Sequence, residues 1–396
     1  MIDPKDSQAI SVSCFGGQAP YLRRELEGLG MPILGEGLTT VETRGTLDDA
    51  QRLNFHLRTA LHVLILLKEL NCKDADELYR EARKLSWERL VPPDGYLTVT
   101  SRVDTPAIRN SMFASQRLKD AVVDRILEKT GRRPDSGSEK KGVVLSLFCK
   151  VDRAWIYFNS NGQKLADRGY RKMPHAAPLR ETLAAALLME AGYDGSCPVL
   201  FPMCGSGTLP IEAALIATGR APGFCRNAFS FMHIQGFDAE AWKSLRREWS
   251  LSKREPAFAI HASDIDPAAI DAARKNARTA GVEELIDWQV CDFAAMPIPE
   301  TPGKILLNPE YGERLGGETE LAALYKRIGD WFKQSCGGWE GFLFTGNKAL
   351  AKTVGLRPSR RVPFWNGMIE CRLLRYEIYA GSRKGEARAE APDGGE

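Results

Sequence analysis

The sequence lacks a long apolar run. The stretch Leu61 to Leu67 ends at Lys68, and no window reaches the roughly 18 apolar residues that a membrane-spanning helix needs. The first residues also lack a basic segment followed by an apolar one, so no secretory signal is predicted. We therefore expect a cytoplasmic protein with no membrane partner.

Cysteine and histidine are present without the spacing that disulfide or metal sites need. The nine cysteines are odd in number and form no C-x-x-C pair, which argues against a disulfide framework and a zinc ribbon. The five histidines are scattered. We expect reduced thiols and no bound metal.

Extremes of composition and net charge are also absent. The 396 residues are 43% hydrophobic and 27% charged, which is ordinary for a globular protein of two or three domains. The net charge is +3, but residues 101–180 hold 17 Lys/Arg against 8 Asp/Glu. This basic stretch indicates a surface that faces a polyanion, or a solvated face with no ligand, and charge alone does not decide between them.

The first part of the chain, up to about residue 165, mixes short strands with amphipathic helices. Alternating or β-branched runs predict strands at 10–15, 97–101, 143–148 and 151–160. Apolar residues at helical spacing predict helices at 21–29 and 112–129. The segment 131–142 is expected to be a polar loop.

From about 166 to 380 the pattern alternates strand and helix, which is typical of a parallel α/β sheet. Strands are predicted at 198–201, 258–262, 286–290, 304–307 and 341–344, and helices at 209–217 and 267–280. Asn366-Gly367 lies between two strand-like runs and predicts a hairpin. A parallel sheet ending in a hairpin is the topology of class I methyltransferases. The polar residues 381–396 are expected to be a disordered tail.

A glycine-rich segment follows the first of these strands. The segment Phe201 to Thr208 opens a helix, and its glycines allow a ligand to approach the backbone closely. No Lys follows the last glycine, so it is not a phosphate loop of the G-x-x-x-x-G-K type. Taken alone, the segment also fits a tight turn between strand and helix.

Acidic residues follow the second and third strands. Asp264 is placed to bind the ribose hydroxyls of a nucleoside, whereas Asp266, before Pro267, is expected to cap the next helix. The spacing of 57 positions from Gly207 to Asp264 exceeds the roughly 20 of a simple dinucleotide fold, which indicates an insertion. Asp292 and Phe293 would receive an adenine, although this pair is common by chance.

The fourth strand is followed by Asn308-Pro309-Glu310-Tyr311-Gly312. Ligands of open α/β sheets bind at the carboxyl ends of strands. The Asn308 oxygen and the Pro309 carbonyl are suited to accept from an exocyclic NH₂, and Tyr311 to stack on a planar base. The alternative is a simple Asn-Pro turn.

Together these motifs resemble the THUMP-bearing guanine-N2 RNA methyltransferases, especially their large-subunit 23S rRNA branch. The resemblance rests on PMCGSGT, SDIDP and NPEYGERLG, on 168–171 and 177–184, on 45–50 and 57–60 near the N-terminus, and on Ala221-Pro222-Gly223 with Arg226 in the insertion. It covers nearly the whole chain. It implies a ferredoxin-like part at 1–70, a THUMP domain at 71–165 and a class I methyltransferase domain at 166–380.

The resemblance also implies the cofactor and the roles of particular residues. The cofactor would be S-adenosylmethionine, held by Thr182, Pro202, Cys204, Gly205, Ser206, Gly207, Asp264, Ile265, Asp292 and Phe293. The catalytic residues would be Asn308, Pro309 and Tyr311. RNA would be bound by Arg102, Arg109, Arg117, Arg168, Arg171 and Lys172, although each of these also fits a merely solvated basic position.

Two positions depart from the family pattern. Phe201 stands where the family usually has Asp, and Glu310 where it usually has a second Pro. We expect a methyltransferase acting on the N2 amine of a guanine in RNA, most simply 23S rRNA. The alternatives are a tRNA guanine-N2 enzyme, an adenine-N6 enzyme, and an inactive RNA-binding ribosome-assembly protein, the last suggested by these two departures.

Overall fold

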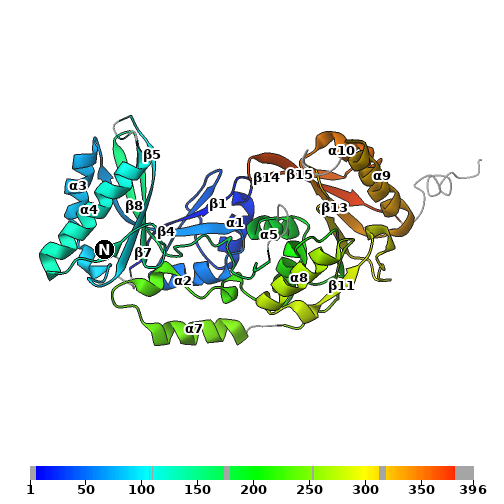
Figure 1. Ribbon diagram of the computed structural model, residues 1–396, viewed down its shortest axis with the longest axis horizontal. Coiled ribbons are helices and arrows are strands. Elements are labelled where there is room, and N and C mark those ends of the chain that lie inside the picture. The colour runs from blue at the N-terminus through cyan, green and yellow to red at the C-terminus, as the bar shows by residue number, and fades with distance from the viewer. Residues whose placement is uncertain are drawn as a thin grey trace, which may run out of the picture. The chain divides into compact units, whose positions relative to one another are not determined.

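The structure is a computed structural model, and it describes residues 6–106, 108, 110–173, 179–251, 254–311 and 318–379. The chain packs as two compact units, shown in Figure 1. Unit 1 comprises residues 1–169 and 221–252, and unit 2 comprises residues 170–220 and 253–396. The predicted boundaries at 70, 165 and 380 remain predictions, and the predicted tail at 381–396 lies outside the described residues.

Unit 1 is built on an eight-stranded sheet with the order β2-β3-β1-β4-β8-β7-β5-β6. Its strands are β1 Gln8–Cys14, β2 Gly35–Glu36, β3 Thr40–Gly45, β4 Ala60–Asn71, β5 Tyr96–Asp104, β6 Asp135–Ser136, β7 Val143–Lys150 and β8 Arg153–Asn159. Its helices are α1 Ala19–Gly28, α2 Leu47–His56, α3 Ala75–Arg83, α4 Ser111–Thr130 and α7 Ala239–Leu251.

Local sequence signals account for the ends of two of these helices. Thr46 and Asp49 form a capping box at the start of α2. The Asn110 side chain accepts from the first N–H groups of α4, and Gly131 ends that helix in the left-handed conformation. The loop predicted at 131–142 holds the two residues of β6, which pair with β5.

The predicted insertion packs within unit 1. Trp242 of α7 is 3% exposed, and its ring lies 6.1 Å from that of Phe55 on α2 and 4.8 Å from that of Phe231. A Cβ built at Gly223 would lie 2.6 Å from Phe55 Cα, so the two segments meet backbone to backbone. The segment therefore contributes apolar side chains to the unit 1 core, among them Phe229, Phe231 and Trp242, although both flanking segments belong to unit 2.

Unit 2 is built on a seven-stranded sheet with the order β11-β10-β9-β12-β13-β15-β14. Its strands are β9 Val199–Pro202, β10 Ile260–Asp264, β11 Ile286–Val290, β12 Lys304–Leu307, β13 Glu340–Thr345, β14 Arg360–Asn366 and β15 Ile369–Glu377. Its helices are α5 Glu181–Glu190, α6 Thr208–Ala217, α8 Pro267–Ala280, α9 Glu318–Ser335 and α10 Lys348–Thr353.

The pairing in this sheet confirms the predicted topology. Strands β9 to β13 are parallel, and β15 joins β13 in the antiparallel direction with β14 at the edge. The hairpin prediction is confirmed with its turn shifted by one residue. Asn366 pairs with Ile369, so Gly367 and Met368 form the turn, and Gly367 has φ +66°. Glycine at the first turn position suits a type II′ turn.

Candidate active site

The glycine-rich segment leaves β9 through an unusual backbone. Met203 has φ +59°, and Gly205 and Gly207 have φ +54° and +83°. A non-glycine residue with positive φ marks strain that the surroundings must hold, and such strain gathers at functional sites. A Cβ built at Gly207 would lie 2.8 Å from Ala273 Cβ on α8, whereas one at Gly205 would meet nothing within 4 Å. Gly207 therefore permits helix packing, and Gly205 leaves space for a ligand.

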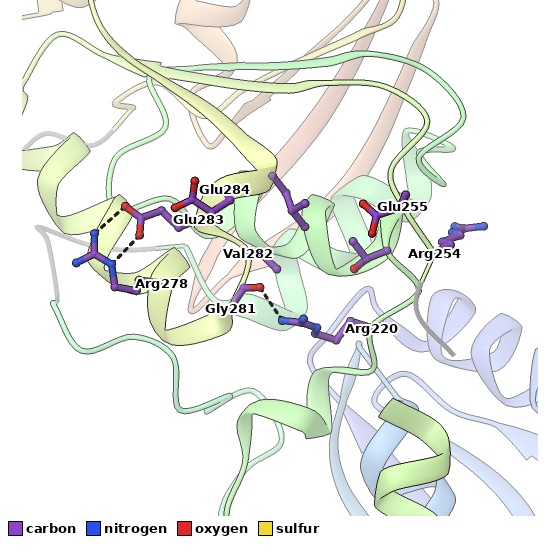
Figure 2. Close-up of a pocket in the computed structure, with 10 residues that line it drawn as sticks. Arg220, Arg254, Glu255, Arg278, Gly281, Val282, Glu283 and Glu284 are labelled. Atoms are coloured by element: carbon purple, nitrogen blue, oxygen red, sulfur yellow. Dashed lines mark hydrogen bonds and ion pairs between the residues drawn. The ribbon is translucent and has the colours of Figure 1, made fainter. Parts of the chain in front are cut away.

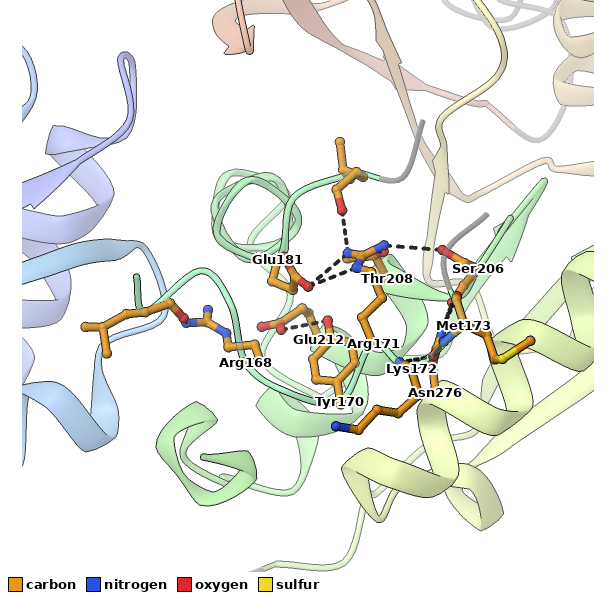
Figure 3. Close-up of polar contacts among 12 residues, drawn as sticks. Arg168, Tyr170, Arg171, Lys172, Met173, Glu181, Ser206, Thr208, Glu212 and Asn276 are labelled. Carbon is orange, nitrogen blue, oxygen red and sulfur yellow. Dashed lines mark hydrogen bonds and ion pairs between the residues drawn. The ribbon is translucent and has the colours of Figure 1, made fainter. Parts of the chain in front are cut away.

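Arg171 holds this segment from the side, as Figure 3 shows. Its guanidinium donates to Glu181 Oε1 at 3.1 Å, to Thr208 Oγ1 at 3.1 Å and to the Leu179 carbonyl at 2.8 Å, with a longer bond to Ser206 Oγ at 3.4 Å. The Arg171 side chain is 17% exposed. Arg171 thus ties the start of α6 to the start of α5, and the structure gives it a positioning role instead of the expected RNA contact.

A second bridge in Figure 3 reaches the same loop from α8. The Asn276 oxygen accepts from the backbone N–H groups of Lys172 and Met173 at 2.9 and 3.0 Å. Its amide donates to the carbonyls of Met173 and Ser206, each at 3.1 Å. Asn276 is 1% exposed. A lone Asn inside a helix carries no local sequence signal, so this contact was not predictable.

The two aspartates after β10 have different partners, and Asp266 caps α8 as predicted. Asp266 accepts from Ala268 N at 2.9 Å and caps α8. Asp264 accepts from Gly205 N at 2.9 Å through one oxygen and from Asp266 N at 3.1 Å through the other. Asp264 therefore fixes the glycine segment, and its remaining lone pairs are available to a ligand. Ile265 is 70% exposed beside it.

The pair after β11 is already engaged. Asp292 accepts from Ala294 N and pairs with Arg327 at 2.9 Å. Phe293 is 4% exposed, packs edge-on against Trp331, and has the Arg327 guanidinium 5.0 Å from its ring centre. Phe293 is thus held by Trp331 and Arg327, and its packing on an adenine ring stays a prediction.

The loop after β12 carries an unpaired acceptor. Asn308 Oδ1 is buried and has no hydrogen-bond partner among the described residues. An unsatisfied buried acceptor costs about 1–3 kcal/mol, so it points to a missing ligand. Pro309 is buried, whereas the Glu310 side chain is exposed and its carbonyl accepts from Tyr325 Oη at 3.3 Å.

Tyr311 is oriented by the sheet beside it. Its hydroxyl accepts from Asn366 Nδ2 at 2.9 Å, and its ring lies edge-on to Phe344. Burial raises the pKa of Tyr311, so the hydroxyl stays protonated. A Cβ at Gly346 would lie 3.0 Å from the Tyr311 ring, so the ring packs closely against this glycine. The sequence offered no signal for Gly346 or for the Asn366 contact.

Other predicted site residues differ in their surroundings. Thr182 on α5 is fully buried, and its hydroxyl has no partner among the described residues. Pro202 ends β9 in the core, Cys204 N donates to the Ser263 carbonyl, and burial raises the pKa of the Cys204 thiol. Phe201 is fully buried, so its side chain is part of the sheet core.

The predicted RNA-binding residues differ in their burial and partners. Arg102 and Lys172 are exposed. Arg117 pairs with Asp76 at 2.6 Å and lies over the Tyr79 ring. Arg168 is 1% exposed and donates to the carbonyls of Leu165 and Arg58, so it is a structural residue of unit 1. Arg109 lies outside the described residues.

A separate cavity of about 410 Å³ opens at the other end of the unit 2 sheet (Figure 2). Arg220 lines it and donates to the carbonyls of Ala280 and Gly281, at the end of α8. Arg278 is paired with Glu283. Because α8 begins at the carboxyl end of β10, its last turn lies at the opposite edge, away from the loops described above.

Within the described ranges, no group of three or more His, Cys, Asp or Glu side chains is placed to hold a metal ion. None of the described helices has the length and apolar character that crossing a membrane needs.

Three family models match the chain. The model described as "RMKL-like, methyltransferase domain" matches residues 168–375, that of the THUMP domain matches 72–159, and that of the RlmL ferredoxin-like domain matches 9–64.

Curated relatives and solved structures agree with these models. A "Ribosomal RNA large subunit methyltransferase K/L" from Syntrophotalea carbinolica is 37% identical over 91% of this chain and 52% of its own length. The chain thus spans about half of that relative. A protein from Synechocystis sp., named as an RNA methyltransferase, is 36% identical over 83% of this chain and 86% of its own. A methyltransferase solved with SAH superposes with a TM-score of 0.85 at 25% identity, over 96% of this chain and 99% of its own.

Proposed function

Because the chain belongs to the family of RMKL-like methyltransferases that carry a THUMP domain, we propose that it methylates the N2 amine of a guanine in RNA. The methyl donor is S-adenosylmethionine, and the favoured substrate is 23S rRNA. The named K/L relatives support the substrate class, and the loop after β12 supports the exocyclic amine. The observation that carries the proposal is the buried oxygen of Asn308, which has no hydrogen-bond partner in the part of the chain that the structure describes.

The residues at the ends of β9 and β10 fit the methyl donor. The space beside Gly205 leaves room for it against the backbone, Asp264 offers acceptor positions to ribose hydroxyls, and exposed Ile265 offers an apolar surface. The bound donor supplies a methyl group already activated on a sulfonium, so the protein needs no covalent nucleophile. A methyltransferase of this fold solved with SAH supports the assignment.

The loop after β12 orients the acceptor amine. Asn308 Oδ1 and the Pro309 carbonyl accept the two N2 hydrogens and favour the pyramidal nitrogen of the transition state. Tyr311, held by Asn366, stacks on the base after it leaves its helix. The main contribution to rate is therefore orientation of the amine toward the methyl carbon.

The two departures from the family pattern are compatible with an active enzyme. Phe201 is fully buried in the sheet, and the Glu310 side chain is exposed. Neither side chain takes the acceptor positions of Asn308 or Pro309. We therefore rank the inactive RNA-binding alternative below the catalytically active ones. Calorimetric titration with S-adenosylmethionine separates the two, because an inactive protein that has lost the donor site gives no binding heat.

The central test compares Asn308→Ala with Glu310→Ala, its exposed neighbour on the same loop. Asn308→Ala should abolish methyl transfer to rRNA from a strain that lacks this gene, while donor binding stays within about twofold. Glu310→Ala should retain activity. Equal activity of wild type and Asn308→Ala would refute the role of Asn308. Nucleoside mass spectrometry of the product identifies the methylated position.

The same product analysis decides between the remaining substrates. An Asn-Pro-Glu-Tyr loop serves any planar exocyclic amine, so an adenine-N6 activity is the second candidate. A structure from Listeria monocytogenes described as a predicted N6-adenine-specific DNA methylase superposes at 27% identity with a TM-score of 0.84. The THUMP match favours RNA over DNA. N2-methylguanosine in rRNA supports our proposal. N2-methylguanosine in tRNA, or methyladenosine, contradicts it.

A further inference from the structure

The tip of the β14–β15 hairpin exposes apolar side chains beside the proposed catalytic loop. Met368 is 99% exposed in the turn, Ile369 is 50% exposed, and Trp365 is 39% exposed. A two-residue turn usually carries polar residues. The fully exposed Met368 gains nothing from packing in the folded chain, so the fold does not explain its presence.

The tip is physically joined to Tyr311. Asn366 Nδ2 donates to Tyr311 Oη at 2.9 Å. A Cβ built at Gly346 would lie 2.9 Å from Ile369 Cγ2 and 3.0 Å from Tyr311 Cδ2, so both side chains pack on the same glycine. The same hairpin therefore holds Tyr311 through Asn366 and exposes an apolar surface at its turn.

The charge around the hairpin fits a polyanion. Residues 357–379 contain five arginines and two glutamates. Arg361 is exposed on β14, the edge strand, on the same face as Trp365. Arg360, Arg372 and Arg375 are paired with carboxylates of Glu190, Glu370 and Glu340. An apolar tip beside the exposed Arg361 is suited to nucleic acid, because Arg361 meets a phosphate while Met, Ile and Trp meet bases.

We propose that Trp365, Met368 and Ile369 contact the bases that flank the methylated guanine and stabilise its extruded state. Extruding a base breaks its stacking on both neighbours, at a cost of a few kcal/mol. Apolar side chains that enter the vacated stack replace part of that contact, as wedge residues do in other nucleic-acid complexes. This inference rests on the proposed function, since it names how the same site obtains its base.

Two variants test the inference, with a matched control. Met368→Ser and Trp365→Ala change exposed side chains and should leave folding and donor binding intact. For each variant, kcat/KM for unmodified rRNA should fall at least about fivefold, the lower end of what losing one base contact costs. Leu38→Ser alters a residue that is 90% exposed next to a glycine in unit 1, and should leave kcat/KM unchanged.

Cross-linking gives a second reading that does not depend on turnover. Ultraviolet irradiation of the full chain with a 23S rRNA transcript, followed by peptide mass spectrometry, should find RNA attached within residues 361–372. Cross-links only outside this range, or a kcat/KM within twofold of wild type for both variants, would overturn the inference. If the tip instead binds a second copy of the chain, Met368→Ser will convert a dimer to a monomer in sedimentation, which also overturns it.

The two readings separate this inference from the proposed function. If RNA cross-links to the hairpin and no methyl is transferred, the proposed reaction fails and the hairpin contact stands. If methylguanosine forms and the hairpin neither cross-links nor affects kcat/KM, the reaction stands and the hairpin contact fails. Asn366→Ala supplies the link between them, because it should lower kcat through Tyr311 while the hairpin cross-link persists.

Discussion

At the scale of single residues, several side chains of this site hold its backbone in place through hydrogen bonds. Asp264 holds Gly205 N and Asp266 N, and Arg171 joins the starts of α5 and α6. Asp264 was predictable as a candidate site residue, because an acidic residue at the end of a strand is placed to bind ribose hydroxyls. Arg171 was not, because the carboxylate and hydroxyls it meets lie 10 to 37 positions away. A basic residue in a basic stretch offers no local sign of burial.

Replacing Asp264 by alanine should weaken donor binding by about 1.5–3 kcal/mol, the range for a hydrogen bond to a charged group. It should also lower the melting temperature slightly, because Gly205 N and Asp266 N lose their acceptor. Asp264→Asn keeps one acceptor oxygen, so its donor affinity should lie between those of wild type and Asp264→Ala. Calorimetry and thermal unfolding measure both effects. Donor affinity that is unchanged in Asp264→Ala would contradict the assignment.

At the scale of elements, several strands and helices that form from local pattern were predicted, whereas helices α2, α3, α5, α7, α9 and α10 were not. The helix at 267–280 and the strands at 286–290 and 304–307 match α8, β11 and β12. The 12-residue strand β4 was missed, although it lies near the middle of the unit 1 sheet. Its sequence, ALHVLILLKELN, alternates poorly because both of its faces are partly covered. Such a run does not distinguish strand from helix by period.

The glycine segment between β9 and α6 supports a paired prediction. Gly207→Ala should destabilise unit 2 by about 1–3 kcal/mol, because its Cβ would lie 2.8 Å from Ala273 Cβ and its φ is +83°. Gly205→Ala meets no neighbour and should be less destabilising, but should reduce donor binding more, since its Cβ enters the open space. Denaturant unfolding and calorimetry on both variants test this. Equal effects on both measurements would refute the division of roles.

At the scale of the whole molecule, the chain leaves unit 2 at residue 220, completes the core of unit 1, and returns at 253. The length of the insertion was evident from the spacing between Gly207 and Asp264, but its packing partner was not. Spacing reports that residues are extra, whereas the partner depends on aromatic contacts with Phe55, which lies more than 160 positions earlier.

Trp242→Ala tests this arrangement. Removing a large side chain that is 3% exposed should destabilise unit 1 by about 3–5 kcal/mol. The donor site lies in unit 2, so donor affinity should stay near that of wild type. Hydrogen exchange read by mass spectrometry reports each unit separately. Loss of protection in unit 2 with unit 1 unchanged would contradict the packing of the insertion.

The histidines predict how the whole molecule responds to acid. Burial is the main cause that lowers the pKa of both His56 and His62 to about 4. The His56 ring is packed between Phe55 and Trp249. His62 Nδ1 faces the side-chain amides of Asn159 and Asn161, at 3.2 and 2.9 Å. Since Asn161 Oδ1 accepts from Val63 N, its amide must donate to His62, which leaves Nδ1 without a proton.

Both histidines belong to unit 1, so acid should weaken that unit. Each has a lower pKa folded than unfolded, so the unfolded chain binds more protons between about pH 4 and 6.5, and stability falls as pH drops through this window. Burial raises the pKa of Glu25 and Glu42, which opposes the effect.

The double variant His56→Gln with His62→Gln should flatten the pH dependence of unfolding, by about 1–3 kcal/mol per site across the window. Urea unfolding at pH 7 and pH 4.5 measures the change. An unaltered slope in the double variant would show that neither ring is held neutral by its surroundings.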